Sequence, residues 1–216
     1  IKSNVYGTFE EFDKEISIDP LVFKKPQGAM SRGVFLALNK HENNNLSKFI
    51  SRSIFFIDEV KDLVRYSKHK GYIKESIYRN KFITQSFIPN LKHDFKILIF
   101  GEKYFIFSRP VKENDFRASG SGYQKYLFGS KCKYPRKIFD YATLIFNKMN
   151  TPNLSLDIAY DGKDFHLLEF QGIYFGTVGL IKSDVYFKNI NNNFISFNND
   201  STIESIYAES IINYIK

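Results

Sequence analysis

The sequence is poor in the residues and runs that mark secreted, disulfide-built and membrane-spanning proteins. Among its 216 residues there is one cysteine, Cys132, and no tryptophan. A single cysteine cannot form an internal disulfide bond, which favours a reducing compartment. The sequence also holds no signal peptide and no run of about 18 apolar residues. No membrane span is therefore predicted, and a cytoplasmic location is expected.

Patterns typical of nucleophilic catalysis are also missing. No Ser/His/Asp or Cys/His arrangement stands out that would activate a side chain for covalent attack. We expect His166 to have a structural role and Cys132 to be an incidental thiol. The sequence therefore gives no support to a mechanism that runs through a covalently modified side chain.

Basic residues, by contrast, are in excess. The chain carries 31 Lys and Arg residues against 23 Asp and Glu, a formal charge of +8, and 43% of its residues are hydrophobic. The apolar content is enough for the core of one compact domain or of two small lobes. The positive charge favours an anionic partner, which leaves nucleic acid, a nucleotide, a phosphorylated substrate and a lipid surface open.

Strand and helix patterns are mixed along the chain, which predicts the α+β class. Strands are predicted over residues 20–25, 34–38, 81–88, 95–101, 103–109 and 155–172. The segments 95–109 and 155–172 each have the pattern of a hairpin, because turn residues interrupt two apolar runs. Loops are predicted over residues 43–45 and 111–133.

Four helices are predicted from capping patterns and apolar spacing. Thr8–Glu11 and Ser201–Glu204 are capping-box patterns, and each opens a helix. Gly71 follows the end of a long helix predicted over residues 47–70. Pro135 is expected at the first position of the remaining helix.

The stretch KKPQGAMSRGV places lysines at the end of a strand and a glycine-rich loop directly after them. Backbone N–H groups that are exposed in such a loop can bind phosphate, and a lysine can neutralise its charge. Gly28 and Gly33 permit tight turns and a close approach of the backbone. The spacing is not that of a Walker A loop, and an ordinary hairpin turn explains the pattern as well.

The stretch QSFIPNLKHDFK combines the end of a strand, a proline turn, and then Asp94 and Lys96. Free backbone groups at a strand edge can bind adenine, and a nearby carboxylate can bind ribose hydroxyls. The alternative is a strand followed by a solvated loop.

The stretch SRPVKENDFRASGSG gathers Arg109, Lys112 and Arg117 among small residues. An arginine offers a planar fork of N–H groups for carboxylate or phosphate oxygens. The alternative is a charged surface loop.

The hairpin SLDIAYDGKDFHLLEFQG has polar side chains inside two apolar strands: Asp157 in the first, Glu169 and Gln171 in the second. A buried carboxylate without a partner is costly, and Asp and Gln are disfavoured in strands. Coordination of Mg²⁺ would remove that cost, since Mg²⁺ is commonly held by one or two carboxylates and substrate phosphates. The alternative is that these side chains face solvent.

The spacing of the two carboxylates predicts how the hairpin pairs. Asp157 and Glu169 lie 12 residues apart. They can lie opposite each other if the loop has an odd number of residues, either GKD or DGKDF, or if a bulge intervenes. His166 and Phe170 are then expected on the other face. A two-residue turn would instead pair Asp157 with His166 and separate the carboxylates.

Taken in order, these four segments resemble the ATP-grasp family, most closely the branch of the ribosomal-protein glutamate ligases and more distantly D-alanine–D-alanine ligase. The resemblance covers roughly residues 8–172. It implies two small α+β lobes whose antiparallel sheets enclose ATP, which we expect at residues 1–88 and 89–216. Family members usually carry a further N-terminal domain, and we expect it to be absent from this chain.

The resemblance implies a role for each motif. The ATP-binding set would be Lys24, Gly28, Ser31, Gly33, Gln85, Ser86, Phe87, Ile88, Asp94 and Lys96. Arg109 would contact the triphosphate, and Arg117 would lie near an acyl phosphate. Asp157, Glu169 and Gln171 would bind Mg²⁺.

Two positions depart from the family pattern. The usual acid of the adenine-binding hinge is Ser86 here. The usual asparagine of the metal motif is Gln171, whose amide oxygen reaches one methylene further. Both departures bear on whether catalysis is retained.

The implied reaction is a Mg²⁺-dependent, ADP-forming ligation. ATP would phosphorylate a substrate carboxylate, and an amine would attack the resulting acyl phosphate. Two alternatives stay open: a nucleotide-binding module without catalysis, and, less favoured, a basic nucleic-acid-binding domain. The sequence identifies neither the carboxylate nor the amine, and it leaves homo-oligomerisation open.

Overall fold

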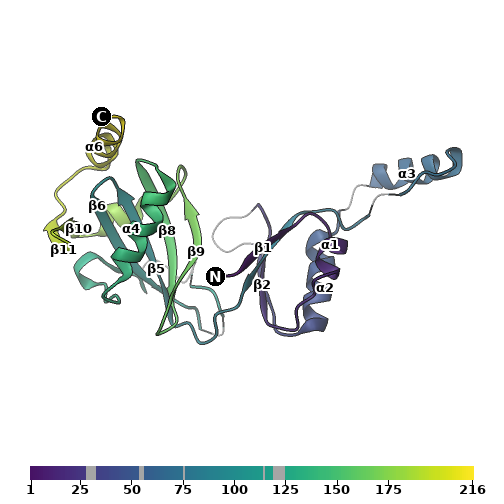
Figure 1. Ribbon diagram of the computed structural model, residues 1–216, viewed down its shortest axis with the longest axis horizontal. Coiled ribbons are helices and arrows are strands. Elements are labelled where there is room, and N and C mark those ends of the chain that lie inside the picture. The colour runs from purple at the N-terminus through teal and green to yellow at the C-terminus, as the bar shows by residue number, and fades with distance from the viewer. Residues whose placement is uncertain (28–32, 54–55, 75, 114, 119–124) are drawn as a thin grey trace. The chain divides into compact units, whose positions relative to one another are not determined.

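The chain forms two units, each built from an antiparallel sheet and helices. The computed structural model describes residues 1–27, 33–53, 56–74, 76–113, 115–118 and 125–216. Compact units cover Ile1–Phe87 and Ile88–Lys216, called unit 1 and unit 2 below (Figure 1). The α+β class is therefore confirmed. Among the helices of the described ranges, none is long and apolar enough to cross a membrane.

Unit 1 holds a four-stranded sheet in the order β1-β4-β2-β3. Its strands are β1 (Ser3–Tyr6), β2 (Leu21–Lys24), β3 (Val34–Ala37) and β4 (Phe82–Ser86). Helix α1 (Phe9–Asp13) begins at the predicted capping box: the Thr8 hydroxyl accepts from the N–H of Glu11 at 3.2 Å, and the Glu11 carboxylate accepts from the N–H of Gly7 at 2.6 Å. Phe12, Phe23 and Phe82 pack edge to face or stacked in a buried aromatic core.

The prediction for residues 43–70 was wrong. Helix α2 spans Lys40–Ser51, and a separate helix α3 spans Phe56–Lys68. Asn39 caps α2 by accepting from the N–H of Glu42 at 3.0 Å. Asn43, expected in a loop, is buried in α2 and donates to the carbonyl groups of Ser17 and Asp19, at 3.0 Å each. A polar residue was thus mistaken for a loop residue because its partners lie far away in the sequence.

Helix α3 is amphipathic, and acidic side chains on its polar side contact the segment that follows the helix. Asp62 accepts from the Tyr72 hydroxyl at 2.6 Å, and Glu59 pairs with Lys74 at 2.7 Å. Its apolar side chains, including Phe56 and Leu63, are exposed.

Unit 2 is built on a larger sheet in the order β11-β10-β6-β5-β8-β9, with β7 paired to β6. Its strands are β5 (His93–Phe100), β6 (Lys103–Pro110), β7 (Leu127–Phe128), β8 (Asn153–Tyr160), β9 (Phe165–Gln171), β10 (Val185–Ile190) and β11 (Asn193–Asn198). Strand β7 and a 3-10 turn at Gly129–Lys131 lie in the segment expected to be loop. Both predicted hairpins, β5–β6 and β8–β9, are confirmed.

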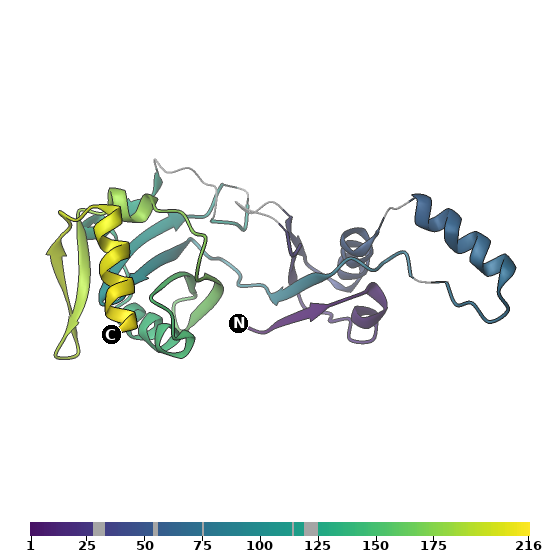
Figure 2. The same ribbon diagram turned by 90° about the horizontal axis from the view of Figure 1, so that it is seen from above.

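The β10–β11 hairpin was missed (Figure 2). Its turn consists of Asn191 and Asn192, both with positive φ, at 52° and 63°. Asparagine tolerates this conformation better than most residues, so a two-residue turn is favourable here. The Asn-Asn pair between two alternating runs was the available signal.

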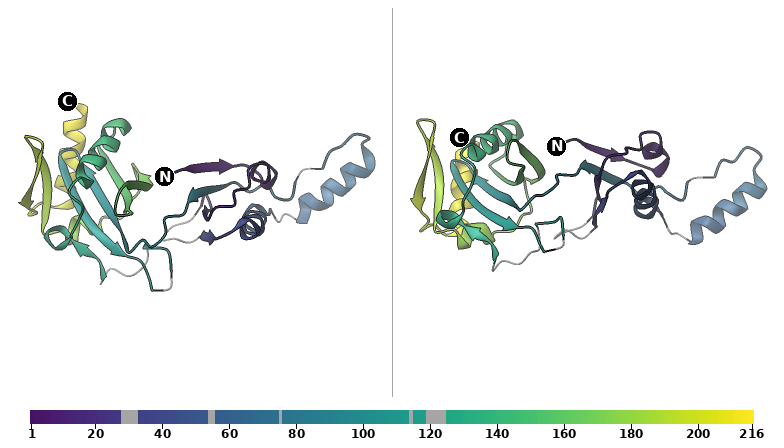
Figure 3. Two further views of the ribbon diagram at one scale, coloured as in Figure 1. Left: turned by 60° about the horizontal axis from the view of Figure 1, so that its bottom comes forward. Right: turned by 90° about the horizontal axis from the view of Figure 1, so that it is seen from below.

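Helices cover both faces of this sheet (Figure 3). Helix α4 (Ile138–Met149) packs on one face against a core that includes Ile97, Ile106 and Leu156. Helices α5 (Val178–Lys182) and α6 (Ile203–Ile215) cover part of the other face. On that face Leu98, Phe100 and Phe105 are buried, and we call this region the apolar end.

Two predicted helix starts were displaced. Helix α4 begins after its N-cap Lys137, so Pro135 lies ahead of the helix rather than at its first position. In α6 the cap is Thr202, not Ser201, and its hydroxyl accepts from the N–H of Ser205 at 3.3 Å.

Candidate functional site

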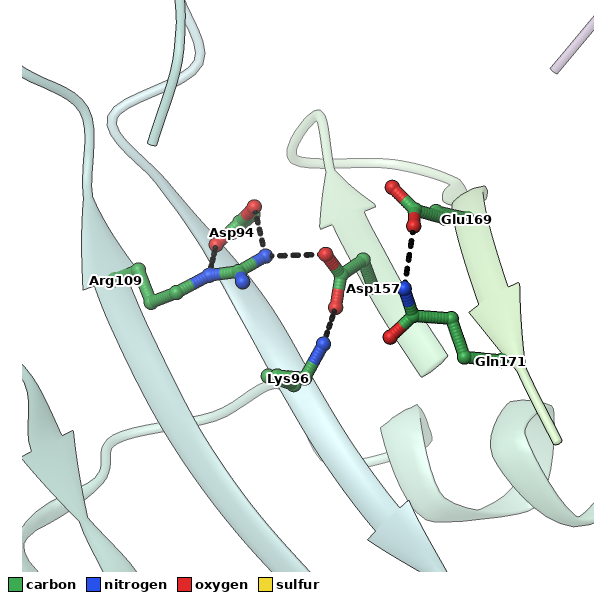
Figure 4. A network of polar contacts seen from close by, with 6 residues as sticks. All are labelled: Asp94, Lys96, Arg109, Asp157, Glu169 and Gln171. Atoms are coloured by element: carbon green, nitrogen blue, oxygen red, sulfur yellow. Dashed lines mark hydrogen bonds and ion pairs between the residues drawn. The ribbon is translucent and has the colours of Figure 1, made fainter. Parts of the chain in front are cut away.

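The candidate site lies on the α5/α6 face of the unit 2 sheet, at the end of β5 away from the apolar end. In the register, Asp94 is opposite Arg109, and Lys96 is opposite Asp157. Asp157 is in turn opposite Glu169 on β9. Directly opposed residues of antiparallel strands share a face, so four strands bring these side chains together (Figure 4). We call this region the polar end.

Asp94 and Arg109 form a two-pronged ion pair at the polar end. Arg109 donates from Nε to Asp94 Oδ1 at 2.7 Å and from Nη2 to Asp94 Oδ2 at 2.6 Å (Figure 4). Arg109 is 6% exposed and Asp94 4% exposed. Such a fork fixes the plane of the guanidinium as well as its position.

Asp157 joins this pair to Lys96. Its Oδ2 lies 2.8 Å from Nη2 of Arg109, and its Oδ1 accepts from Lys96 Nζ at 2.7 Å. Asp94, Arg109, Asp157 and Lys96 therefore form a chain of alternating charge, visible in Figure 4.

The electrostatics of the chain differ between its two carboxylates. Burial raises the pKa of Asp94 above its ordinary value, against the pull of Arg109. Burial alone would also raise the pKa of Asp157, but Arg109 and Lys96 outweigh it, so this pKa is lowered. The pKa of Arg109 is raised because the two carboxylates outweigh its burial. Asp157 is thus the carboxylate that the site keeps ionised most firmly.

Glu169 and Gln171 complete the polar end from the edge strand β9. Glu169 is exposed, and its Oε1 accepts from the Gln171 amide nitrogen at 3.0 Å. The Gln171 amide oxygen points away from Glu169 (Figure 4). Both residues share a face with Asp157 through the register Asp157–Glu169 and Ser155–Gln171.

These oxygens fit a Mg²⁺ ion that is held jointly with phosphate groups. Within the ranges that the structure describes, no three His, Cys, Asp or Glu side chains group closely enough to hold a metal ion. Asp157, Glu169 and Gln171 offer two carboxylates and one amide oxygen, all hard ligands on one face. Mg²⁺ usually takes one or two carboxylates and completes its shell with water and substrate oxygens, so the donor set suits it.

The predicted pairing of Asp157 with Glu169 is confirmed, but the predicted odd-residue loop is wrong. Residues 161–164 form a four-residue loop between β8 and β9. The register of the two strands then shifts by one residue between the pair made by Ile158 and the pair made by Asp157. The extra residue on β9 is Leu168, because Ile158 pairs with Leu167 and Asp157 with Glu169. The bulge alternative therefore holds.

The bulge also overturns the prediction for His166. This residue is opposite Ala159, which shares a face with Asp157, so its register places it on the carboxylate face. Its Nε2 lies 2.7 Å from Asp161 Oδ2, outside the network of the polar end. Phe170 is opposite Leu156 and lies on the other face, as predicted.

Arg117 lies in the segment that follows β6. Its Nε and Nη2 donate to the Asp115 carboxylate at 2.9 and 2.7 Å. The Arg117 side chain is 34% exposed. The residue expected near an acyl phosphate is thus held by a neighbour two positions away, and this pairing was missed.

In unit 1, Lys24 is the last residue of β2, opposite Val34 and Ile83. Gly33 has a φ of +81°, and a Cβ there would meet the Lys25 side chain at 3.2 Å, so glycine is favoured. Gly28 and Ser31 lie outside the described residues.

The expected adenine-binding segment is the end of β4 and the residues after it. Gln85 is opposite Val22 and Ser3 in the sheet. The N–H of Ser86 donates to the Lys2 carbonyl at 3.0 Å, and the N–H of Phe87 to the Pro20 carbonyl at 3.3 Å. Both of these N–H groups are therefore used within unit 1. Ile88 is the first residue of unit 2.

The pairing of Asp94 with Arg109 was not predicted, although the sequence carried a signal for it. The two-residue turn at Gly101–Glu102 places these residues opposite each other. The ribose role expected for Asp94 and the phosphate role expected for Arg109 do not imply a contact between them.

Comparison with solved structures identifies the fold. D-cycloserine synthetase DcsG matches with a TM-score of 0.58 at 8% identity, over 100% of this chain and 65% of that chain. D-alanyl-alanine synthetase A from Vibrio cholerae O1 biovar eltor matches with a TM-score of 0.55 at 10% identity, over 99% and 59%. The macrocyclase MdnC from Microcystis aeruginosa, bound with the precursor peptide MdnA, matches with a TM-score of 0.51 at 12% identity, over 98% and 55%.

The chain has the ATP-grasp fold, as the sequence resemblance implied. It spans less than two thirds of the length of each of these three structures. No family model matches the sequence, and no curated protein matches it.

Proposed function

We propose that the protein is an ATP-dependent ligase that activates a substrate carboxylate as an acyl phosphate for attack by an amine. The observation that carries this proposal is the polar end, where Asp157 and Glu169 share one face beside Lys96 and Arg109. Carboxylates for a metal next to cations for phosphate are the parts that phosphoryl transfer needs. The ATP-grasp fold supports the same reaction class.

In this mechanism the protein positions reactants and stabilises charge. Lys96 and Arg109 of unit 2 bind phosphate oxygens of ATP. Asp157, Glu169 and Gln171 hold Mg²⁺, which when bound neutralises phosphate charge and polarises the transferred group. Lys96 Nζ and Arg109 Nη2 lie 2.7 and 2.8 Å from the carboxylate oxygens of Asp157. Both cations are therefore within reach of a phosphate group placed beside Asp157.

The reaction itself then requires no side-chain nucleophile. A carboxylate oxygen of the substrate attacks the γ-phosphorus, and ADP leaves with the bonding electron pair. The amine attacks the acyl carbon of the mixed anhydride, phosphate departs, and a proton leaves the amine nitrogen. Arg109 offsets the negative charge that spreads over the phosphoryl oxygens. Arg117 has the same role toward the acyl phosphate if it leaves Asp115.

Hydroxylamine trapping tests the proposal. Acyl phosphates react with hydroxylamine to give hydroxamates, so the purified protein is incubated with ATP, Mg²⁺, hydroxylamine and a panel of carboxylates. The names of the similar structures include two amino-acid-related synthetases and a macrocyclase bound with a peptide, so the panel holds amino acids and acidic peptides. We expect ADP and hydroxamate to form together with at least one carboxylate. ADP formation that no carboxylate stimulates would contradict the proposal.

A nucleotide-binding module without catalysis is the second candidate. It is favoured by Gln171 and by the two cations that already occupy both oxygens of Asp157. This candidate predicts ATP binding by calorimetry with neither ADP nor hydroxamate formed across the panel.

A further inference from the structure

Asp94 occupies a position where a role in binding ribose was expected, but its surroundings do not suit that role. A carboxylate that binds a ribose must present an oxygen to the ligand. Asp94 is 4% exposed, and both of its oxygens accept from Arg109. Releasing Asp94 toward a ribose would leave the buried Arg109 without this partner, which is costly.

The fork determines what Arg109 can offer to Asp157. Nε and Nη2 form the edge of the guanidinium that faces Asp94, and Nη2 alone also reaches Asp157, at 2.8 Å. Asp157 therefore receives a single contact from Arg109 rather than a two-pronged one. Without Asp94, the same edge would be free to form its fork with Asp157 instead and would compete there with any other cation.

We infer that Asp94 is a positioning residue: it holds the guanidinium of Arg109 in a fixed plane, so that each Asp157 oxygen, which accepts from one cation, keeps its second lone pair for the metal, and Arg109 stays beside the phosphates. This inference rests on the proposed function and adds to it a residue that acts through another. It also replaces the ribose contact expected from the sequence.

Nucleotide binding to substituted proteins separates the two roles. Asp94→Asn keeps the size of the side chain but removes its charge and places a donor against Arg109. Titration calorimetry with Mg²⁺ compares ATP with 2′,3′-dideoxy-ATP, which lacks both ribose hydroxyls. If Asp94 positions Arg109, Asp94→Asn should weaken the binding of ATP and of 2′,3′-dideoxy-ATP by the same factor, about tenfold or more. Asp94→Glu, which keeps the charge, should recover part of the loss.

Asp140→Asn is the matched control, because Asp140 is an exposed carboxylate on α4, which packs on the opposite face of the sheet. It should bind both nucleotides as the wild type does. Weaker binding of ATP with unchanged binding of 2′,3′-dideoxy-ATP in Asp94→Asn would overturn the inference and restore the ribose contact.

A measurement on the wild type keeps the test decisive if Asp94→Asn does not fold. The Nε–H group of Arg109, assigned by its disappearance in Arg109→Lys, should give a slowly exchanging NMR signal because it donates to Asp94 in a buried fork. Positioning predicts that this signal persists when MgATP binds. Its loss on binding would show that Asp94 leaves Arg109 and would overturn the inference. Failure of the wild type to bind MgATP would instead overturn the proposed function, and the inference with it.

Discussion

The two ends of one sheet face in unit 2 use the same strands to opposite effect. At the apolar end, Leu98 and Phe105 are opposite each other and fully buried under α5 and α6. A few residues along the same strands, Asp94 and Arg109 are opposite each other and almost as buried, but charged. The stability of the apolar end depends on how well its side chains fill space, and neighbouring side chains can shift to fill a small change in volume. The stability of the polar end depends on each buried charge having a partner of opposite charge. A fold gains little stability from such a charged end, so its presence favours a ligand-binding role.

The largest effect is expected from breaking the polar end. Arg109→Met leaves Asp94 and Asp157 with one cation, Lys96, and should lower the free energy of unfolding by about 3–5 kcal/mol. Chemical denaturation measures this loss. The double variant Asp94→Leu/Arg109→Met should recover much of the stability, because the buried pair is then replaced by apolar groups. If the double variant were less stable than Arg109→Met, the fork would not be the source of the effect.

A pH-dependent effect is expected on the opposite face, where Cys132 is buried in the core beneath α4. Burial raises the pKa of its thiol to about 11. In the unfolded chain the thiol has a pKa of about 8.5. Between this pH and the higher pKa of the folded state, unfolding releases a proton, so the free energy of unfolding falls as the pH rises. The loss is at most about 1.4 kcal/mol per pH unit.

Unfolding measured between pH 8 and pH 11 for the wild type and for Cys132→Ala isolates this contribution. The wild type should lose stability more steeply than the variant above about pH 8.5. Parallel curves would mean that the thiol ionises equally in both states and is not protected by the core.

A smaller effect is expected where α5 packs on the sheet. Gly179 in α5 packs on this sheet face beside the apolar end, and a Cβ there would lie 2.7 Å from Phe107 Cε1 and 2.9 Å from Leu98 Cδ1. Gly179→Ala should therefore overpack the apolar end and cost about 1–3 kcal/mol, as measured by thermal unfolding. Combining it with Leu98→Val should reduce the cost, since space is returned beside the new methyl group. An unchanged stability in Gly179→Ala would show that α5 does not pack tightly there.

The smallest effect on stability is expected at the edge of the polar end. Glu169 is exposed, and its carboxylate accepts a hydrogen bond from the Gln171 amide at 3.0 Å. Glu169→Gln should change the free energy of unfolding by less than about 0.5 kcal/mol. A loss as large as that of Arg109→Met would mean that Glu169 belongs to the structural network rather than to a ligand site.

The sequence predicted the register of the site better than its contacts. The separation of Asp157 and Glu169 predicted that they pair, but a four-residue loop with a bulge gives the same pairing as an odd-residue loop. The bulge then moved His166 to the carboxylate face, which no spacing rule could reveal. The chain from Asp94 to Lys96 spans three strands, so it requires the sheet order as well as each hairpin.

The fold showed the same pattern. The capping box at Thr8 and both central hairpins follow from local signals and were predicted. The start of α2 was missed because Asn43 is satisfied by carbonyl groups far away in the sequence. Local rules identify elements whose hydrogen bonds close locally, and they fail where a polar residue is satisfied at long range.

The central claim is that the polar end binds the metal of a nucleotide complex. The most direct test is titration calorimetry of ATP with and without Mg²⁺, for the wild type, Glu169→Gln and Glu102→Gln. Glu102 is an exposed carboxylate in the β5–β6 turn, beyond the apolar end, and serves as the matched control. We expect Mg²⁺ to strengthen ATP binding in the wild type and in Glu102→Gln, and we expect Glu169→Gln to lose about tenfold or more of this gain. An equal effect of Mg²⁺ in all three proteins, or no ATP binding by the wild type, would contradict it.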